Sequence, residues 1–234
     1  MCAQRYGENM TVTIRCLAHA SFQIKTDTQN IYIDPSTKGT GLKKDDFEPA
    51  DLIFITHGHQ DHFDKDLIKK IRKMGSPIIA PPNLKKELKG GIIWDLGLGQ
   101  HMDISTSGVH VWTTPAYNIK RFRPNGDPFH PKELGVGYLI RIEGVKIYHA
   151  GDTDFIPEME RLEEADVDVA LLPIGDTYTM DIADATEAAG VIKSKIVIPM
   201  HVKDADPEVF KSEVESKTSS KVVVLREGEE YVVE

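Results

Sequence analysis

Residues 51–62 combine a buried-strand pattern with a dense group of metal-binding side chains, and no other segment constrains the fold as strongly. Asp-Leu-Ile-Phe-Ile-Thr (51–56) is a continuous apolar run that ends in a polar residue, which is typical of a strand buried on both faces of a sheet. His57-Gly58-His59-Gln60-Asp61-His62 follows directly. The chain therefore needs a layer on each face of this strand and a polar site where the strand ends.

The rest of the chain alternates between strand and helix patterns. Strands are expected at Val12 to Leu17, Phe22 to Thr26, Ile31 to Asp34, Val109 to Thr114, Val136 to Ile142, Val145 to His149, Val167 to Pro173, Ile196 to Met200 and Val222 to Leu225. Helices are expected at Asp64 to Met74, Asp181 to Ile192 and Pro207 to Glu215. Strands followed by strand and helix units in each half fit two sheets packed on each other with helices outside.

Length and composition favour one domain over residues 1–234. The chain contains no low-complexity tract, fixed-period repeat or Ser/Gly linker that would mark a boundary. A chain of this length can bury roughly 70–75% of its unfolded surface, so it does not need a metal ion to fold. A metal site in it is therefore expected to serve chemistry.

The charge balance bears on partners and location. With 28 Lys and Arg against 37 Asp and Glu, the net charge is -9, which argues against a non-specific nucleic-acid binder. No apolar stretch approaches the roughly 20 residues of a membrane helix, and residues 1–10 have no apolar signal region. We therefore expect a soluble, cytoplasmic protein without a membrane partner. A homo-oligomer is one alternative for its assembly.

The histidines after the buried strand have the spacing of metal ligands. His57 and His59 lie two positions apart and can share one cation on an extended loop, whereas Asp61 and His62 can turn to a second. Nitrogen ligands with one oxygen ligand suit Zn²⁺, with Mn²⁺ and Fe²⁺ as competitors. The cofactor expected from these residues is therefore a pair of divalent metal ions.

This segment resembles the HxHxDH motif of the metallo-β-lactamase superfamily, which also follows a strand. The resemblance covers most of the chain and includes, in the same order, Asp34-Pro35, Gly151-Asp152-Thr153 and Pro199-Met200-His201. It implies an α/β fold of the αββα four-layer sandwich type. It also implies that Asp152 bridges two metal ions and that the second ion is held by Asp61, His62 and His201.

One position departs from the superfamily pattern. A third histidine usually joins His57 and His59 after a strand that resembles residues 113–116, but Tyr117-Asn118 stands there. An amide oxygen is a poorer ligand for Zn²⁺ than an imidazole. Three alternatives are open: His130 becomes the missing ligand, Asn118 binds weakly or through water, or the first site is empty and one metal ion is used.

Residues 17–22, 33–35 and 148–153 resemble the branch with ascorbate-6-phosphate lactonase-like proteins and N-acyl-phosphatidylethanolamine phospholipase D. This resemblance implies a hydrolase that acts on substrates other than β-lactam antibiotics. Together with the basic segment 117–132, it favours a small anionic ester, lactone or phosphodiester. The expected nucleophile is a metal-bound hydroxide, because two cations lower the pKa of a shared water from about 15.7 towards about 7. Asp61 and Asp152 are the expected catalytic carboxylates. The alternatives are a metal-binding protein with little catalysis and a phosphodiesterase acting on nucleic acid.

Several other side chains are candidates for contacts at the site. Residues 117–132 carry four cations against one carboxylate, so Arg121 and its neighbours either attract an anionic substrate or form an exposed basic loop. His19 is expected to contact the substrate or a metal ligand, and Tyr178 follows a strand on a loop that could face the substrate. Asp34 is a candidate partner for a ligating imidazole.

Three remaining histidines are expected outside the reaction. His149 is expected to be a buried supporting residue because it lies just before Asp152, and His101 and His110 lie away from every motif.

Overall fold

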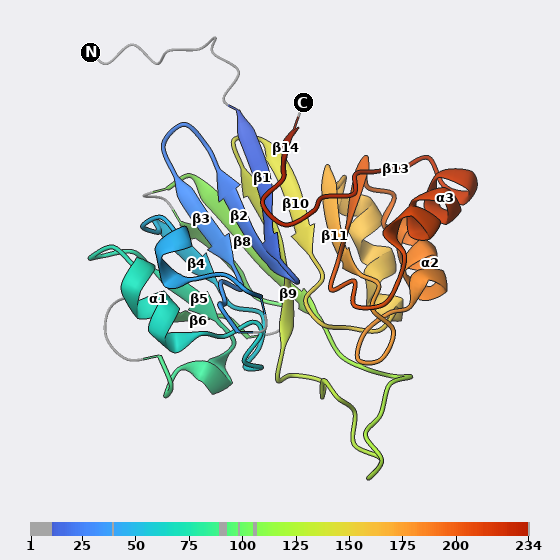
Figure 1. The fold of residues 1–234 in the computed structure, drawn as a ribbon, viewed down its shortest axis with the longest axis horizontal. Coiled ribbons are helices and arrows are strands. Elements are labelled where there is room, and N and C mark those ends of the chain that lie inside the picture. The colour runs from blue at the N-terminus through green and yellow to red at the C-terminus, as the bar shows by residue number, and fades with distance from the viewer. Residues whose placement is uncertain (1–10, 39, 89–92, 98, 105–106, 234) are drawn as a thin grey trace.

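Two β-sheets pack face to face with helices on both outer sides (Figure 1). The structure is a computed structural model that describes residues 11–38, 40–88, 93–97, 99–104 and 107–233. Helix α1 lies outside the first sheet, and α2 and α3 lie outside the second. This arrangement confirms the αββα four-layer sandwich. No helix in the described part of the chain is long and apolar enough to cross a membrane.

The first sheet is antiparallel at one edge and parallel at the other. Its order is β14 (Glu230–Val233), β1 (Val12–Ala18), β2 (Ser21–Lys25), β3 (Asn30–Ile33), β4 (Leu52–Phe54), β5 (Ile78–Ala80) and β6 (Ile93–Asp95). The pairs from β14 to β3 are antiparallel, and those from β3 to β6 are parallel. The histidine-rich segment thus leaves a strand with parallel neighbours on both sides.

The second sheet repeats this division. Its order is β13 (Lys221–Val222), β12 (Ile196–Met200), β11 (Val169–Pro173), β10 (Val145–His149), β9 (Val136–Ile142), β8 (Val109–Pro115) and β7 (His101–Ile104). Strands β7 to β10 pair antiparallel, and β10 to β13 pair parallel. The carboxyl ends of β10 and β12 therefore lie at one edge of this sheet.

Aspartates precede the three α-helices of the described residues, which are α1 (Lys65–Ile71), α2 (Ile182–Ile192) and α3 (Pro207–Lys217). Asp64, Asp181 and Asp206 each accept a hydrogen bond from a first-turn backbone N–H, an interaction worth about 1 kcal/mol. Three short 3-10 segments complete the helices: η1 (Lys44–Asp46), η2 (Pro82–Leu84) and η3 (Pro157–Ala165).

The main hydrophobic core fills the space between the two sheets. Phe22 and Phe54 of the first sheet and Tyr138 and Tyr148 of the second are fully buried in it. A smaller core joins the outer face of the first sheet to α1, whose Leu67 is fully buried. With both faces covered, the strands hold their ends in fixed positions, and the loops that leave those ends carry the polar side chains.

Candidate metal centre

The side chains predicted to bind metal meet where β4, β10 and β12 end. The loop after β4 carries His57, His59 and His62, whereas Asp152 follows β10 and His201 follows β12. The buried apolar strands fix where each loop begins, so residues distant in sequence are brought to one place.

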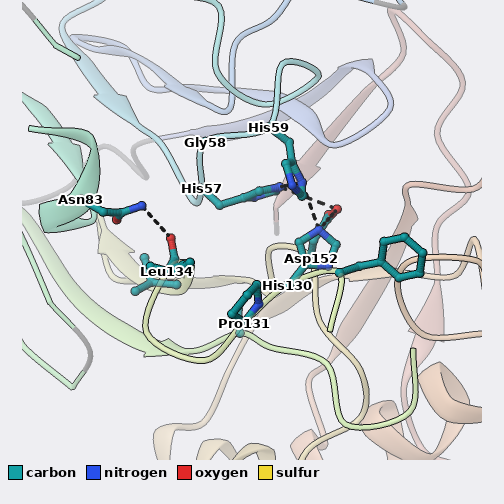
Figure 2. A pocket seen from close by; sticks show the side chains of 12 residues that line it. His57, Gly58, His59, Asn83, His130, Pro131, Leu134 and Asp152 are labelled. Atoms are coloured by element: carbon teal, nitrogen blue, oxygen red, sulfur yellow. Dashed lines mark hydrogen bonds and ion pairs between the residues drawn. The ribbon is translucent and has the colours of Figure 1, made fainter. Parts of the chain in front are cut away.

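One group of four side chains lies on the β4 side of the centre. His57, His59, His130 and Asp152 each offer a ligand atom, and these atoms all lie within 4.8 Å of one another. Nδ1 of His59 lies 3.0 Å from Nε2 of His57 and 3.2 Å from Nε2 of His130. Nε2 of His130 is 3.2 Å from Oδ2 of Asp152. Figure 2 shows the three imidazoles converging near Asp152.

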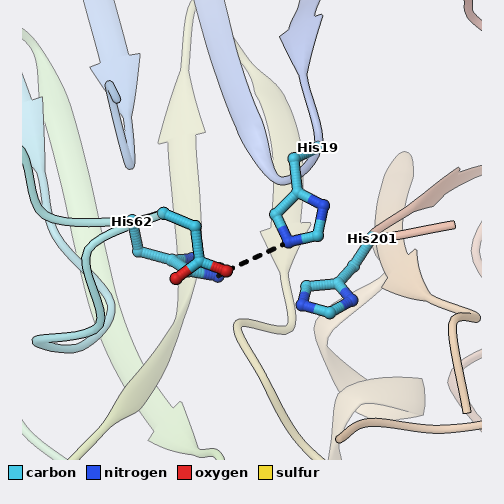
Figure 3. A group of neighbouring side chains, drawn as sticks. His19, His62 and His201 are labelled. Carbon is cyan, nitrogen blue, oxygen red and sulfur yellow. Dashed lines mark ion pairs between the residues drawn. The ribbon is translucent and has the colours of Figure 1, made fainter. Parts of the chain in front are cut away.

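A second group lies beside the first and consists of His19, Asp61, His62 and His201, again with ligand atoms within 4.8 Å of one another. Nε2 of His19 lies 3.3 Å from Oδ2 of Asp61, and His19, His62 and His201 gather around this contact (Figure 3). Asp152 reaches this group too, because its Oδ1 is 3.4 Å from Nε2 of His62 and its Oδ2 is 3.3 Å from Nε2 of His201. One buried carboxylate therefore contacts both groups.

Hydrogen bonds from Asp34 and Thr56 orient two of the imidazoles. Nδ1 of His62 donates to Oδ2 of Asp34 over 2.8 Å, and the Thr56 hydroxyl donates to the same oxygen over 2.5 Å. Nδ1 of His57 lies 3.0 Å from that hydroxyl oxygen and is assigned as its donor. The Nε2 atoms of His57 and His62 therefore face the centre, as ligation requires. Asp34 has the supporting position expected from the sequence.

Asn118 orients His130 in the same way. Oδ1 of Asn118 accepts hydrogen bonds from the backbone N–H of His130 over 2.7 Å and from Nδ1 of the same residue over 2.9 Å. The Asn118 amide nitrogen donates to the carbonyl of Tyr178 over 2.9 Å, which fixes the direction of the amide. His130 thus carries its proton on Nδ1, and its Nε2 lone pair points to Asp152.

Burial and the surrounding charges set the protonation states. Burial lowers the pKa of His57 well below its ordinary value and also lowers the pKa of His59, which favours the neutral imidazole that binds metal. Burial would raise the pKa of Asp152, but His201 and His62 outweigh it and keep this pKa well below its ordinary value. Burial would lower the pKa of His62 too, but Asp152 and Asp34 outweigh it and hold this pKa well above its ordinary value. The centre therefore combines neutral His57 and His59 with an ionised Asp152 and with a His62 proton that a bound cation would displace.

Several polar atoms of the centre are buried without a hydrogen-bond partner among the described residues. They include Nε2 of His62, Oδ1 of Asp152 and Nδ1 of His201. An unsatisfied buried polar group costs about 1–3 kcal/mol. A divalent cation with nitrogen and oxygen ligands would satisfy the inward-facing atoms of His62 and Asp152 together, so these residues fit such an ion.

Arg121 does not contact the centre, and its expected role as a substrate contact is wrong. Its guanidinium, with only 11% of the side chain exposed, forms ion pairs of 2.5–3.2 Å with Asp154, Asp176, Asp181 and Asp184. Oδ2 of Asp154 also accepts the backbone N–H groups of residues 119–121. Arg121 and Asp154 therefore fix the loop that carries Asn118 and His130.

The basic loop is largely neutralised. Lys120 pairs with Asp184, and Lys132 pairs with Glu158. Arg123 forms no ion pair with any described residue; its guanidinium carbon lies 5.0 Å from the ring centre of Phe129. Among the cations of this loop, Arg123 therefore remains available, and the sequence did not distinguish it from its neighbours.

Two cavities meet at the metal-binding groups. The first, of about 180 Å³, extends from His59 towards Leu134. The second, of about 280 Å³, is lined by His59, Asp61, Arg123, Phe129, His130, Asp152, Tyr178 and His201, and we call it the polar mouth. His59, His130 and Asp152 line both cavities. A substrate can therefore approach these three residues from two sides.

His149 has the supporting role expected for it. Its Nε2 donates to the carbonyl of Ala20 over 3.1 Å, and its Nδ1 accepts the backbone N–H of Gly151 over 3.1 Å. Gly151 has a φ of +66°, and a Cβ there would lie 2.9 Å from the carbonyl oxygen of Val136. His149 and Gly151 thus hold the turn that presents Asp152.

Of the remaining histidines, two lie outside the centre, as expected, and one lies in it. His101 and His110 lie with Asp103 on the outward face of the β7–β8 hairpin and take no part in the centre. His19 is placed as a ligand candidate, one of the contacts that the sequence left open for it. His19 lies in the turn between β1 and β2 with a positive φ of 54°, a conformation that no sequence pattern predicts.

Comparisons with known proteins agree with this geometry. Residues 13–201 match the family described as beta-lactamase superfamily domain. A UPF0173 metal-dependent hydrolase from Archaeoglobus fulgidus is 33% identical over 227 residues, covering 93% of this chain and 97% of the relative. A crystal structure of a metal-dependent hydrolase from Parabacteroides distasonis has a TM-score of 0.82 and 32% identity, covering 93% of this chain and 94% of that one. Igni18, a metallo hydrolase from Ignicoccus hospitalis, has a TM-score of 0.79 and 30% identity, covering 96% of this chain and 99% of its own.

Proposed function

Because this chain belongs to the beta-lactamase superfamily and to its UPF0173 family of metal-dependent hydrolases, we propose that it hydrolyses a small anionic ester, lactone or phosphodiester at a centre of two divalent cations. Zn²⁺ is the ion that suits the imidazole-rich ligand set best, with Mn²⁺ and Fe²⁺ as competitors. A cytoplasmic location, a single domain over residues 1–234 and a homo-oligomeric assembly remain predictions from the sequence.

The observation that carries this proposal is the position of Asp152 between the two groups of ligands. We assign His57, His59, His130 and Asp152 to the first cation. The second cation is assigned to Asp61, His62, His201 and the same Asp152 carboxylate, with His19 beside Asp61. A carboxylate whose two oxygens contact imidazoles of both groups is suited to bridge two cations.

His130 is the proposed substitute for the histidine missing at position 118. Its Nε2 faces Asp152 and His59, and its Nδ1 proton is held by Asn118. The oxygen of Asn118 is already engaged by two donors of His130, so it is poorly placed to ligate a cation itself. This geometry supports His130 as the ligand over direct ligation by Asn118.

The protein side chains supply the proton transfer and the positioning. Divalent cations, when bound, lower the pKa of a water ligand towards about 7 and polarise the bond to be cleaved. Burial would raise the pKa of Asp61, but its contact with His19 and the nearby charge of His62 outweigh burial and hold this pKa below its ordinary value. Asp61 lines the polar mouth as a carboxylate and can accept a proton there.

The anionic substrate is supported by Arg123 in the polar mouth and by Lys203 over the Tyr178 ring, two cations that no described carboxylate neutralises. Arg123 lines this cavity and packs on Phe129, whose ring centre is 4.7 Å from that of Tyr178. Lys203 forms no ion pair with a described residue and lies 3.5 Å from the ring centre of Tyr178. Tyr178 is therefore our candidate for an aromatic contact to the substrate. Because most cations of the basic loop are paired, the geometry does not favour nucleic acid.

The test is turnover of a panel of small esters, lactones and phosphodiesters, each offered with and without an anionic group. We expect turnover that chelation removes and Zn²⁺ restores, because the cations generate the nucleophile. His57→Ala and Asp152→Ala should abolish it with the circular dichroism spectrum unchanged, whereas His101→Ala, a histidine loss outside the centre, should not. Turnover that persists in chelated protein or in Asp152→Ala would contradict the proposal.

A further inference from the structure

The smaller cavity beside the first ligand group, which we call the apolar pocket, differs in chemistry from the polar mouth. His59, His130 and Asp152 line it on the side of the metal-binding group, with Leu134 farther along (Figure 2). Ala116 and Val136 line it as well. Among its described lining residues, Asp152 and the histidines are the ionisable ones. The polar mouth on the other side holds Arg123 instead.

The lining of the apolar pocket offers little to a polar group. Ala116 and Val136 are buried hydrophobic residues, and Leu134 is 49% exposed at the rim. The amide nitrogen of Asn83, which also lines the pocket, donates to the backbone carbonyl of Leu134 over 3.2 Å (Figure 2). A ligand group that enters this space therefore exchanges water mainly for carbon atoms.

The volume of the apolar pocket limits the size of its occupant. At about 180 Å³, it is slightly larger than an apolar protein cavity of about 150 Å³ that binds benzene. A phenyl ring or a branched alkyl group of similar size would fill it. His59, His130 and Asp152 line both the apolar pocket and the polar mouth, so a ligand bound at these three residues reaches both cavities.

Building on the proposed function, we propose that the substrate is amphiphilic, with a phenyl-sized or branched-alkyl group in the apolar pocket and its anionic group in the polar mouth near Arg123. The bond to be cleaved then lies between these groups, beside His59, His130 and Asp152. This arrangement narrows the substrate to a small ester, lactone or phosphodiester with one compact apolar substituent. Leu134 at the rim is assigned as a residue that determines specificity.

The test compares two phosphonates by isothermal titration calorimetry on zinc-loaded protein. Methylphosphonate and phenylphosphonate present the same anionic head to the centre and differ in the group that would enter the apolar pocket. Burying a group of this size from water predicts roughly 10- to 100-fold tighter binding of phenylphosphonate. Equal affinities, or no binding of either compound, would overturn the proposal.

Leu134→Asn replaces the rim side chain by a polar one of similar size, and its partial exposure makes it compatible with folding. The preference for phenylphosphonate is the ratio of the methylphosphonate Kd to the phenylphosphonate Kd. In Leu134→Asn this ratio should fall to less than half of its wild-type value, whereas the affinity for methylphosphonate should stay within about 2-fold of wild type. Val209→Asn is the matched control, because Val209 is 47% exposed on α3 and lines neither cavity. An unchanged preference in Leu134→Asn would overturn the assignment.

The two proposals fail in different ways. Absence of chelator-sensitive turnover with every substrate would contradict the hydrolase proposal, whatever the phosphonates show. If the protein turns over a substrate but binds both phosphonates equally well, the hydrolase proposal stands and the proposal that the apolar pocket binds the substrate fails.

Discussion

Oδ1 of Asn118 lies 2.9 Å from Nδ1 of His130, so the residue that stands where a ligating histidine was expected acts on a histidine twelve positions later. The same oxygen accepts the backbone N–H of His130, so one amide fixes both the backbone and the ring. The first group therefore keeps three histidine ligand candidates although Asn118 replaces the usual histidine, because His130 takes its place. Asn118 is a positioning residue in this account, and His130 is the ligand.

Asn118→Ala should weaken the first metal site without removing it. Loss of a hydrogen bond that orients a ligating imidazole typically costs 10- to 100-fold in metal affinity. We expect Zn²⁺ affinity to fall by roughly this factor in a competition titration with a zinc chelator, and full occupancy to return at excess Zn²⁺. Asn125→Ala, in the same loop but bonded to Asp127, is the control. Wild-type affinity in Asn118→Ala would contradict the role given to this residue.

Asp34→Asn should reduce both stability and metal affinity. The Asp34 carboxylate is fully buried and accepts hydrogen bonds from the Thr56 backbone, the Thr56 hydroxyl and His62. An amide nitrogen cannot accept, so one buried donor loses its partner at a cost of about 1–3 kcal/mol. Urea unfolding of the metal-free protein measures this loss, with the exposed Asp27→Asn as a control. An equal effect of both substitutions would argue against the proposed orientation of His62.

Asp184→Asn should destabilise the protein in a pH-dependent way. Burial would raise the pKa of Asp184, but Lys120 and Arg121 outweigh it and lower this pKa below its ordinary value. The stabilisation is then fully present above the unfolded-state pKa of about 3.9 and is lost as pH falls through the lower folded-state value.

We expect Asp184→Asn to lower the free energy of unfolding by about 1–3 kcal/mol at pH 7 and by less below about pH 4. Urea unfolding at a series of pH values measures this. Asp66→Asn removes a surface ion pair with Lys44 and should cost at most about 1 kcal/mol. A loss for Asp184→Asn that stays constant down to pH 2 would show that the carboxylate charge is not what stabilises the loop.

Arg123→Ala should weaken anion binding at the polar mouth more than Lys132→Ala does. Arg123 has no carboxylate partner among the described residues, whereas Lys132 is held by Glu158 and is the matched control. A hydrogen bond to a charged group is worth about 1.5–3 kcal/mol, so methylphosphonate affinity should fall roughly 10- to 100-fold. Calorimetry on the zinc-loaded variants checks this. Equal affinities in both variants would remove Arg123 from substrate recognition.

Local patterns in the sequence predicted the three α-helices, most of the longer strands and the motif that lies directly after β4, but not the nine-residue segment η3. The strands Val136–Ile142, Val145–His149 and Ile196–Met200 have the predicted bounds, because each is a continuous or nearly continuous apolar run. Strands β5, β6 and β7 were not predicted, because they have three or four residues and, unlike β4, do not lie in a longer continuous apolar run. The last predicted strand is shorter, Lys221–Val222, and β14 was not expected.

The missed parts of the site depend on contacts between distant residues. The ion pairs of Arg121 with Asp154 and Asp184 span 33 and 63 positions, and they turn an expected substrate contact into an anchor for the loop. The sequence shows how many charged residues a segment has, but it does not show which distant residues form ion pairs with them. The remaining free cation, Arg123, could be identified only after its neighbours had been placed.

The central claim is a two-metal centre in which His130 completes the first site. Elemental analysis of protein purified without chelator, reported as metal per chain, tests this claim most directly. We predict about two metal ions in the wild type and about one in each of His130→Ala and His201→Ala, with His101→Ala unchanged. About one metal ion in the wild type, unchanged in His130→Ala, would contradict the account and leave the first site without a role.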